Sequence, residues 1–183
     1  MIIDHIKNFI QRIIKNSEDD FYTPVYGCSR CGYAGILYRH GSYYRNVICE
    51  KIITRVRIQR VICPSCHKTH AIIPSNLIPY YQHTLLTVLK VIELVRVKRE
   101  TYTQIIESFS KFNSCFCKAH INFYLRRFNR NYNKILYYFR TVLNYNPNPP
   151  NCEAAVILEK INKIPLEFNK SYFNHMPKFF LSK

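Results

Sequence analysis

Three hydrophobic patterns follow one another along this chain of 183 residues. Residues 2–15 place apolar side chains at helical spacing, which predicts an amphipathic N-terminal helix that ends near Asn16. The acidic stretch SEDD, residues 17–20, follows as a linker. Residues 36–73 have the short period and the β-branched composition of strands. From His83 onwards the period becomes helical again, so we expect strands first and a helical region after them.

The clearest strand is ITRVRIQRVI, residues 53–62. Apolar and basic side chains alternate along it, with one slip in register. The apolar set is Ile53, Val56, Ile58 and Val61, and the basic set is Arg55, Arg57 and Arg60. The stretch RHGS, residues 39–42, predicts a turn before this strand. The pattern therefore predicts a β-ribbon with one apolar and one basic side.

The second half predicts several helices. We expect helices over 84–97, with Leu85, Leu89 and Ile92 inward, and over 101–112, starting at a Thr cap. A third helix is predicted over 115–131 with Ser114 as N-cap, and a fourth over 131–143. Three prolines in NYNPNPPN, residues 144–151, end the helical pattern. A short helix near 152–163 and a loosely patterned tail follow.

The net charge of +16 exceeds what a fold needs and indicates a polyanionic partner. Residues 28–70 carry +7 and residues 83–144 carry +8, so the partner surface is expected there. Charged residues interrupt the N-terminal apolar pattern, which argues against a signal peptide, and no stretch is long enough for a membrane span. We therefore expect a cytoplasmic, nucleoid-associated protein, whose thiols stay reduced.

Two CxxC pairs, Cys28 with Cys31 and Cys63 with Cys66, carry the strongest chemical signal. Two such turns can direct four thiolates at one point, and that tetrahedral shell suits Zn²⁺. A redox CxxC would need a βαβ context, which the pattern does not predict, and four cysteines would leave no open position for a catalytic metal. We expect a structural zinc site that stabilises the ribbon.

Other candidate ligands are weaker. Cys49 is expected to be a small buried side chain rather than a ligand. His67 and His70 follow the second pair and could replace a thiolate or contact phosphate, although exposed strand-start histidines fit the pattern better. Cys115, Cys117 and His120 could begin a second metal site, but no fourth ligand is evident.

The segment 101–128 has the form of a helix-turn-helix. Its second helix would carry donor-rich side chains on the face opposite the core, where Asn can pair with adenine and Lys or Arg with guanine. Three further groups of basic residues would contact phosphate: those later in the second helix, those on the ribbon, and those at the end of the helix over 84–97. The predicted DNA-binding residues are Lys118, His120, Asn122, Arg126, Arg127, Arg130, Arg55, Arg57, Arg60, Arg96, Lys98 and Arg99.

Together these patterns predict an α+β fold class: an N-terminal helix, a four-cysteine zinc β-ribbon and a helix-turn-helix bundle. The expected divisions are the helix and linker over 1–20, the zinc ribbon over 21–80, the helix-turn-helix domain over 81–145, and a Pro-rich linker and tail over 146–183.

The order of these parts over residues 26–140 resembles the N-terminal DNA-binding region of bacterial insertion-sequence transposases. The CxxC knuckles, the RHG turn and the basic strand before CPSC carry the resemblance. It implies that Cys28, Cys31, Cys63 and Cys66 bind zinc and that the helix at 115–128 is the recognition helix. It also implies double-stranded DNA and a transposase or recombinase as partners. In this chain His67 and His70 replace the glycine and aromatic residue that usually follow the second knuckle.

The catalytic part of such transposases, with three separated carboxylates that bind metal ions, is not evident in this sequence. All three aspartates precede residue 21, and the eight glutamates are scattered. We therefore expect a DNA-binding protein of a mobile element that is not an enzyme. The alternatives are an RNA-binding module, because 15 tyrosines and 12 phenylalanines offer stacking surfaces, and an adaptor subunit of a recombination or defence complex that uses the N-terminal helix and the aromatic tail.

Overall fold

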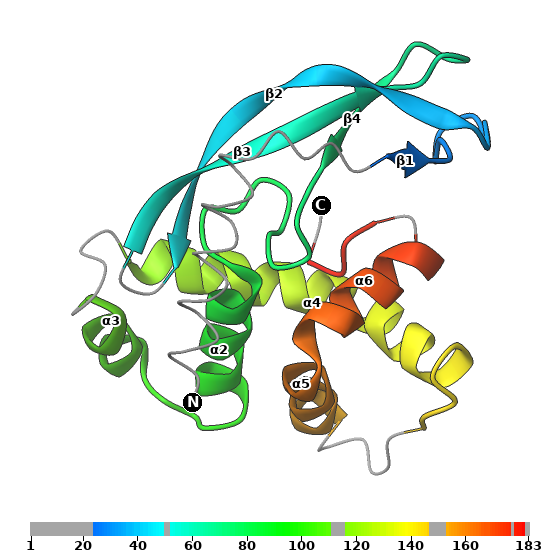
Figure 1. Ribbon diagram of the computed structural model, residues 1–183. Coiled ribbons are helices and arrows are strands. Elements are labelled where there is room, and N and C mark those ends of the chain that lie inside the picture. Colours follow the sequence, from blue (N-terminus) through cyan, green and yellow to red (C-terminus); the bar gives the residue numbers. More distant parts are fainter. Residues whose placement is uncertain (1–23, 50–51, 111–115, 147–152, 177, 182–183) are drawn as a thin grey trace. The chain divides into compact units, whose positions relative to one another are not determined.

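The structure, a computed structural model, describes residues 24–49, 52–110, 116–146, 153–176 and 178–181. Within them the chain is α+β, with a four-stranded antiparallel sheet and five helices (Figure 1). The predicted N-terminal helix and its acidic linker lie outside the described residues. The chain divides into unit 1, residues 1–47 and 53–73, and unit 2, residues 48–52 and 74–183. The division after residue 73 precedes the expected boundary at residue 80.

The sheet has the strand order β1-β2-β3-β4. Its strands are β1 (Val25–Tyr26), β2 (Ile36–Cys49), β3 (Ile52–Ile62) and β4 (Thr69–Ile72). The registers pair Tyr26 with Ile36 at the β1 edge and Val61 with His70 at the β4 edge. Each edge strand therefore lies next to one of the two CxxC turns, which follow β1 and β3 in the chain.

The predicted turn at residues 39–42 is wrong, because these residues lie inside the continuous strand β2. Gly41 adopts φ +83° there, a left-handed conformation that glycine supplies in β-bulges. A glycine flanked by polar residues is the usual signal for a turn, but it serves equally to bend a long strand.

The apolar side of β3 is confirmed at Val56 and Ile58. Val56, Ile58 and Val61 are buried, whereas Ile53 leaves 66% of its side chain exposed. Ile53 lies three positions before Val56, and Val61 lies three positions after Ile58. These odd spacings place both on the opposite face of the pleat, where Val61 joins the cysteine cluster. Arg55 is exposed and Arg57 is half-buried on the face opposite to Val56, whereas the exposed Arg60 lies at an odd spacing from both and therefore on the other face.

Unit 2 begins with two capped helices. Helix α2 (Leu85–Arg96) starts at Thr84, whose hydroxyl accepts the Thr87 N–H at 3.4 Å. Helix α3 (Tyr102–Ser110) follows Thr101, which accepts the Gln104 N–H while the Gln104 side chain accepts the Thr101 N–H at 2.9 Å. This reciprocal pair is a capping box, and it confirms the predicted Thr start.

Two predicted helices, 115–131 and 131–143, are one continuous helix, α4 (Lys118–Thr141). Its buried positions continue at helical spacing through the expected break, with Phe128, Asn131 and Ile135 all facing the core. The Asn131 side chain donates to the carbonyl of Arg127 at 3.0 Å, so this polar residue is accommodated within the helix. The Asn-rich stretch contains no Pro or Gly, and propensity alone does not end a helix. Ser114, the predicted N-cap, lies outside the described residues.

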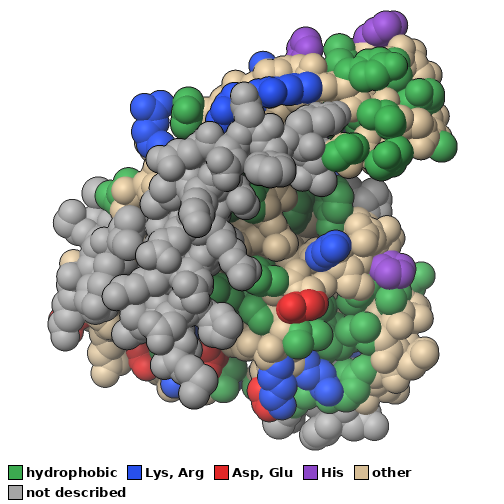
Figure 2. All heavy atoms as spheres, in the orientation of Figure 1, with side chains coloured by type: hydrophobic (Ala, Val, Ile, Leu, Met, Phe, Trp, Pro, Cys, Tyr) green, Lys and Arg blue, Asp and Glu red, His purple; other side chains and the backbone are tan. Residues whose placement is uncertain are grey.

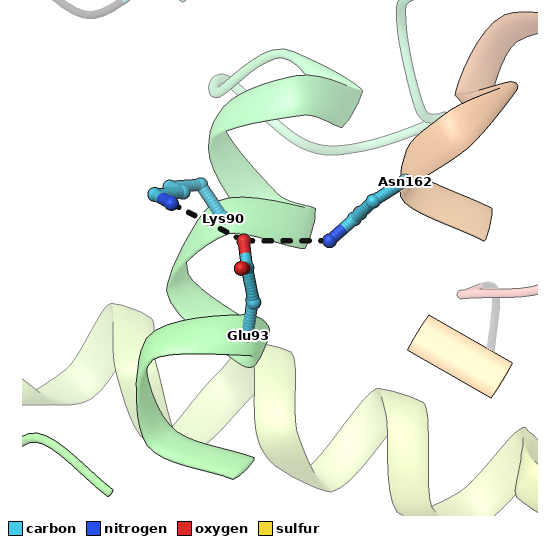
Figure 3. Close-up of polar contacts among 3 residues, drawn as sticks. All are labelled: Lys90, Glu93 and Asn162. Atoms are coloured by element: carbon cyan, nitrogen blue, oxygen red, sulfur yellow. Dashed lines mark hydrogen bonds and ion pairs between the residues drawn. The ribbon is translucent and has the colours of Figure 1, made fainter. Parts of the chain in front are cut away.

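The C-terminal segment is not a loose tail. It forms α5 (Glu153–Lys163), as predicted, and α6 (Pro165–His175), which was not expected. Glu93 on α2 accepts hydrogen bonds from Lys90 at 3.2 Å and from Asn162 on α5 at 3.4 Å, which ties the two helices together (Figure 3).

The last described residues also pack into the core of unit 2. Phe180 and Leu181 are buried in its core, and the Tyr81 hydroxyl donates to the Leu181 carbonyl at 2.8 Å. The aromatic C-terminal residues therefore have their partner within this chain. A separate finding is that no helix in the described ranges is long and apolar enough to cross a membrane.

Candidate metal centre and nucleic-acid interface

The first CxxC pair forms a tight turn after β1. The Gly32 N–H donates to the Cys28 carbonyl at 2.9 Å, and the Cys28 N–H donates to the Tyr33 carbonyl at 2.7 Å. Gly32 has φ +76°, the left-handed conformation that closes the turn. These two bonds fold residues 28–33 back on themselves and place both sulfurs on the same side.

The second CxxC pair repeats this geometry after β3. The His67 N–H donates to the Cys63 carbonyl at 2.9 Å, and the Cys63 N–H donates to the Lys68 carbonyl at 3.0 Å. His67 occupies the position of Gly32 and also has a positive φ, +54°. A side chain in this backbone region is strained, so His67 occupies a site that glycine would fit better.

The four sulfurs converge. The Sγ atoms of Cys28 and Cys66 are 3.8 Å apart, and those of Cys31 and Cys63 are 3.7 Å apart. All four lie within 4.8 Å of one another. A tetrahedron with metal–sulfur bonds of about 2.3 Å has sulfur–sulfur edges of about 3.8 Å. The cluster is therefore compatible with a single metal ion held by four sulfurs.

The two turns shift the pKa of a cysteine in opposite directions. Backbone N–H groups, first that of Cys31 and then that of Arg30, lower the pKa of Cys28 to about 6, against the opposing effect of desolvation. At Cys66 the Lys68 N–H also lowers the pKa, but desolvation and the three neighbouring cysteines outweigh it and raise the pKa to about 11. Four adjacent thiolates repel one another, and a cation among them would relieve this repulsion.

The weaker candidate ligands fall outside this cluster. His70 on β4 is half-buried, and its Nε2 atom lies 3.3 Å from the Cys28 sulfur, close enough to donate a hydrogen bond to it. His67 is exposed. Cys49 is buried, as expected. Cys117 is exposed, and its sulfur lies near the His120 ring. Within the described ranges these two side chains belong to no group of three metal-binding residues, and Cys115 is not among the described residues.

Helix α4 presents a row of polar side chains to solvent. Lys118, Asn122, Arg126 and Arg130 are exposed at spacings of four residues. Such spacing aligns side chains along one helix face. Asn122 also accepts a hydrogen bond from the Tyr102 hydroxyl of α3 at 3.1 Å. Asn122 therefore lies beside α3, and its carbonyl oxygen already accepts one hydrogen bond within unit 2.

His120 has a structural task at the start of α4. Its Nδ1 atom accepts the Cys117 N–H at 3.2 Å, and its ring stacks on Phe116 with centroids 5.5 Å apart. Burial lowers its pKa, so the ring is neutral near pH 7. Its predicted contact with DNA remains a prediction, with less of the side chain available than the sequence alone suggests.

A shallow pocket lies further along α4. Phe123, Arg126, Arg127 and Arg130 line it, and its volume is about 220 Å³. Arg127 lies over the Phe123 ring, 5.1 Å from its centroid. None of the three arginines forms an ion pair within the part of the chain that the structure describes. The pocket thus gathers three arginines that have no ion-pair partner among the described residues.

The predicted basic cluster after α2 is divided. The Arg96 side chain donates from Nη2 to Asn129 on α4 and so joins two helices. Lys98 and Arg99 are exposed. Arg99 has φ +59° and lies at the end of the helix, where the Glu100 N–H donates to the Leu94 carbonyl at 3.0 Å. Two of the three side chains are therefore accessible to phosphate.

Two ribbon arginines contact residues of β2 that the sequence pattern did not single out. Arg57 donates to the Ser42 hydroxyl at 2.9 Å, and Arg55 lies 5.1 Å from the centroid of the Tyr44 ring. Figure 2 shows Lys and Arg side chains along the long strands and hydrophobic side chains towards the β1 end.

Comparison with known proteins adds one match. Residues 28–111 match a family described as a domain of unknown function (DUF6431). The match begins at the first candidate ligand, Cys28, and includes both CxxC pairs, α2 and α3, but not α4. Searches of curated proteins and of solved structures find no match.

Proposed function

We propose that this chain is a zinc-stabilised, sequence-specific double-stranded DNA-binding protein that acts by binding and not by catalysis. The observation that carries the proposal is a metal-compatible cluster of four sulfurs in a strongly basic chain that also exposes a donor-rich helix face. In this account the metal keeps unit 1 folded, and α3 with α4 forms a helix-turn-helix that reads the duplex.

Zinc is the metal that best fits the donor set. Thiolate ligands favour Zn²⁺, and a closed shell of four is typical of structural sites. Cys28, Cys31, Cys63 and Cys66 would hold the ion, and His70 would stabilise the Cys28 thiolate by a hydrogen bond. The chemistry supplied is structural: the ion fixes two turns at the ends of the sheet.

Helix α4 is the reading element in this proposal. Lys118 and Asn122, near its N-terminus, would contact base edges in the major groove. Arg126, Arg127 and Arg130 would contact phosphate, as would Lys98, Arg99 and the ribbon residues Arg55, Arg57 and Arg60. Arg96 and His120 would act mainly by positioning α2 and α4, since both are engaged within unit 2.

The resemblance to transposase DNA-binding regions suggests the biological setting. A zinc ribbon followed by a helix-turn-helix would recognise the ends of a mobile element, and a separate transposase or recombinase would supply the cutting activity. The proposed protein is thus a recognition module, a repressor or a targeting subunit of such an element.

Selection from a random duplex library tests the proposal. The full chain should enrich one sequence, and its affinity for that sequence should fall steeply with salt because bound phosphates release counterions. Asn122→Ala should cost about 1–3 kcal/mol and relax specificity at one base pair. Arg130→Ala should weaken binding to all sequences and reduce the salt slope by about 1.

Lys170→Ala, which removes an exposed cation on α6, is the matched control and should leave affinity unchanged. Failure to enrich any sequence, together with full affinity at about 0.5 M salt, would contradict the proposal. Among the alternatives, the adaptor hypothesis can no longer use Phe180 and Leu181 as a partner surface, because both are buried within unit 2.

A further inference from the structure

Three tyrosines of unit 1 leave more than half of their side chains exposed. The exposed fractions are 65% for Tyr26, 59% for Tyr38 and 58% for Tyr44. Tyr26 and Tyr38 lie on the paired strands β1 and β2, and we call these two the tyrosine surface. A single exposed ring is ordinary, but two on neighbouring paired strands of one small unit call for a reason.

The strand register explains how two of these rings come to face outward. Val25 pairs with Leu37, and both pack in the hydrophobic cluster around the cysteines. Tyr26 and Tyr38 each follow one of these residues in the chain. Because successive side chains of a strand point to opposite faces, both rings project away from that cluster. Their exposure is built into the sheet and does not depend on a loop.

A high content of tyrosine does not by itself explain this exposure. In unit 2, Tyr81, Tyr124, Tyr138 and Tyr172 are all buried, and each has an aromatic ring as neighbour. The chain therefore has room to bury tyrosine where packing requires it. In unit 1 the same residue type is kept at the surface.

The charge around the tyrosine surface is of one sign. The described residues of unit 1, 24–47 and 53–73, contain seven Arg and Lys and no Asp or Glu. Arg60 is exposed and directly precedes Val61 of the cysteine cluster, so strand alternation places its guanidinium on the same face as Tyr26 and Tyr38. The surface is complementary to a partner that is negatively charged along its length and offers flat rings.

We infer that the tyrosine surface binds an unpaired DNA strand, with bases stacked on Tyr26 and Tyr38 and phosphates held by Arg60 and its basic neighbours. Aromatic rings beside a basic surface are the usual means of binding single strands. In a duplex each base is covered by the next, so its ring faces are closed to a side chain. This activity goes beyond duplex recognition by α4 and lies on a different unit.

The inference predicts binding of the full chain to an oligothymidine of about 16 nucleotides, measured by fluorescence anisotropy at low salt. Tyr38→Ala should weaken this binding by about fivefold or more, as loss of one stacked base does, whereas Tyr38→Phe, which keeps the ring, should retain it. A base-free strand of the same length and charge should bind at least as weakly as the Tyr38→Ala variant binds the oligothymidine.

Tyr137→Ala is the matched control, because Tyr137 on α4 has the same 59% exposure but belongs to unit 2. It should leave single-strand binding unchanged, and so should Asn122→Ala, which separates this inference from the proposed duplex recognition. Equal affinity for the base-free strand would overturn the inference. So would equal binding of Tyr38→Ala and the parent chain, or binding only to anionic phosphatidylglycerol vesicles.

Discussion

The two units are stabilised in different ways. Unit 2 has a continuous core in which aliphatic and aromatic side chains from five helices meet, including Ile92, Ile121, Tyr138 and Phe168. In unit 1 the hydrophobic cluster beside the CxxC turns has four buried members, Cys28, Leu37, Val61 and Cys63, and half of them are candidate metal ligands. The comparison teaches that burial suffices for the helical unit, whereas the ribbon needs a cross-link to hold its ends.

The largest expected effect is loss of the metal. Cys63→Ser should prevent stable metal binding, and the turns of unit 1 should open because structural zinc contributes about 10–16 kcal/mol to such folds. Hydrogen exchange in the full chain should show lost protection over β1–β4 of unit 1 and retained protection over α2–α6. Cys117→Ser is the control, since this exposed cysteine lies outside the cluster and serine also suits its N-cap position. Equal protection in Cys63→Ser and the parent chain would remove the contrast between the units.

A cavity created in unit 2 should destabilise the helices and leave metal binding by unit 1 unchanged. Ile92 is fully buried on α2, so Ile92→Ala should lower the free energy of unfolding of the helical unit by about 2–5 kcal/mol. Urea unfolding followed by circular dichroism of the helical signal measures this loss. The metal content should stay at that of the parent chain, and a fall in metal content would show that the units depend on one core.

Acid should also weaken unit 2 through His83. This residue is buried, and its Nδ1 atom lies 2.6 Å from the Tyr124 hydroxyl. Burial, with a smaller effect of His120, lowers the pKa of His83 from 6.5 to about 4. Between these values the unfolded chain binds a proton that the folded chain does not, so stability falls as the pH is lowered.

The expected loss is about 1.4 kcal/mol per pH unit in this window. Urea unfolding at several pH values measures it by the helical signal. His83→Gln should flatten the slope, whereas His175→Gln, at an exposed position on α6, should not. A parent-chain stability that stays constant between about pH 6.5 and about pH 4.5 would disprove this assignment.

The smallest effect concerns the second CxxC turn. His67→Gly should relieve the strain of φ +54° and increase zinc affinity by about twofold, or about 0.5 kcal/mol, after the entropy cost of glycine is subtracted. Gly32→Ala is the converse test: a Cβ there would meet no atom within 4 Å, so any loss of affinity comes from the backbone at φ +76°. Chelator competition measures both, and a weaker site in His67→Gly would assign the His67 side chain a role in holding the metal.

Local periodicity predicted the structure where one spacing dominates. The helix at 85–96 and the Thr101 start follow from apolar spacing and capping chemistry, and the convergence of the four cysteines agrees with the CxxC spacing. The prediction failed where a residue type has two uses. Gly41 bends a strand that it was expected to end, and the asparagines of α4 lie inside a helix that they were expected to interrupt.

Long-range packing was beyond the reach of the sequence pattern. Helix α6 and the docking of Phe180 and Leu181 depend on a core assembled from residues about 100 positions apart, such as Tyr81 and Leu181. The exposure of Tyr26 likewise depends on its register with Ile36, which no local spacing reveals.

X-ray absorption at the zinc edge on the purified full chain tests the central claim most directly, namely that four cysteine sulfurs share one ion. The account predicts one zinc per chain with a first shell of four sulfurs at about 2.3 Å, and loss of that shell in Cys63→Ser. A first shell with nitrogen or oxygen ligands, or a chain that folds with no bound metal, would contradict it.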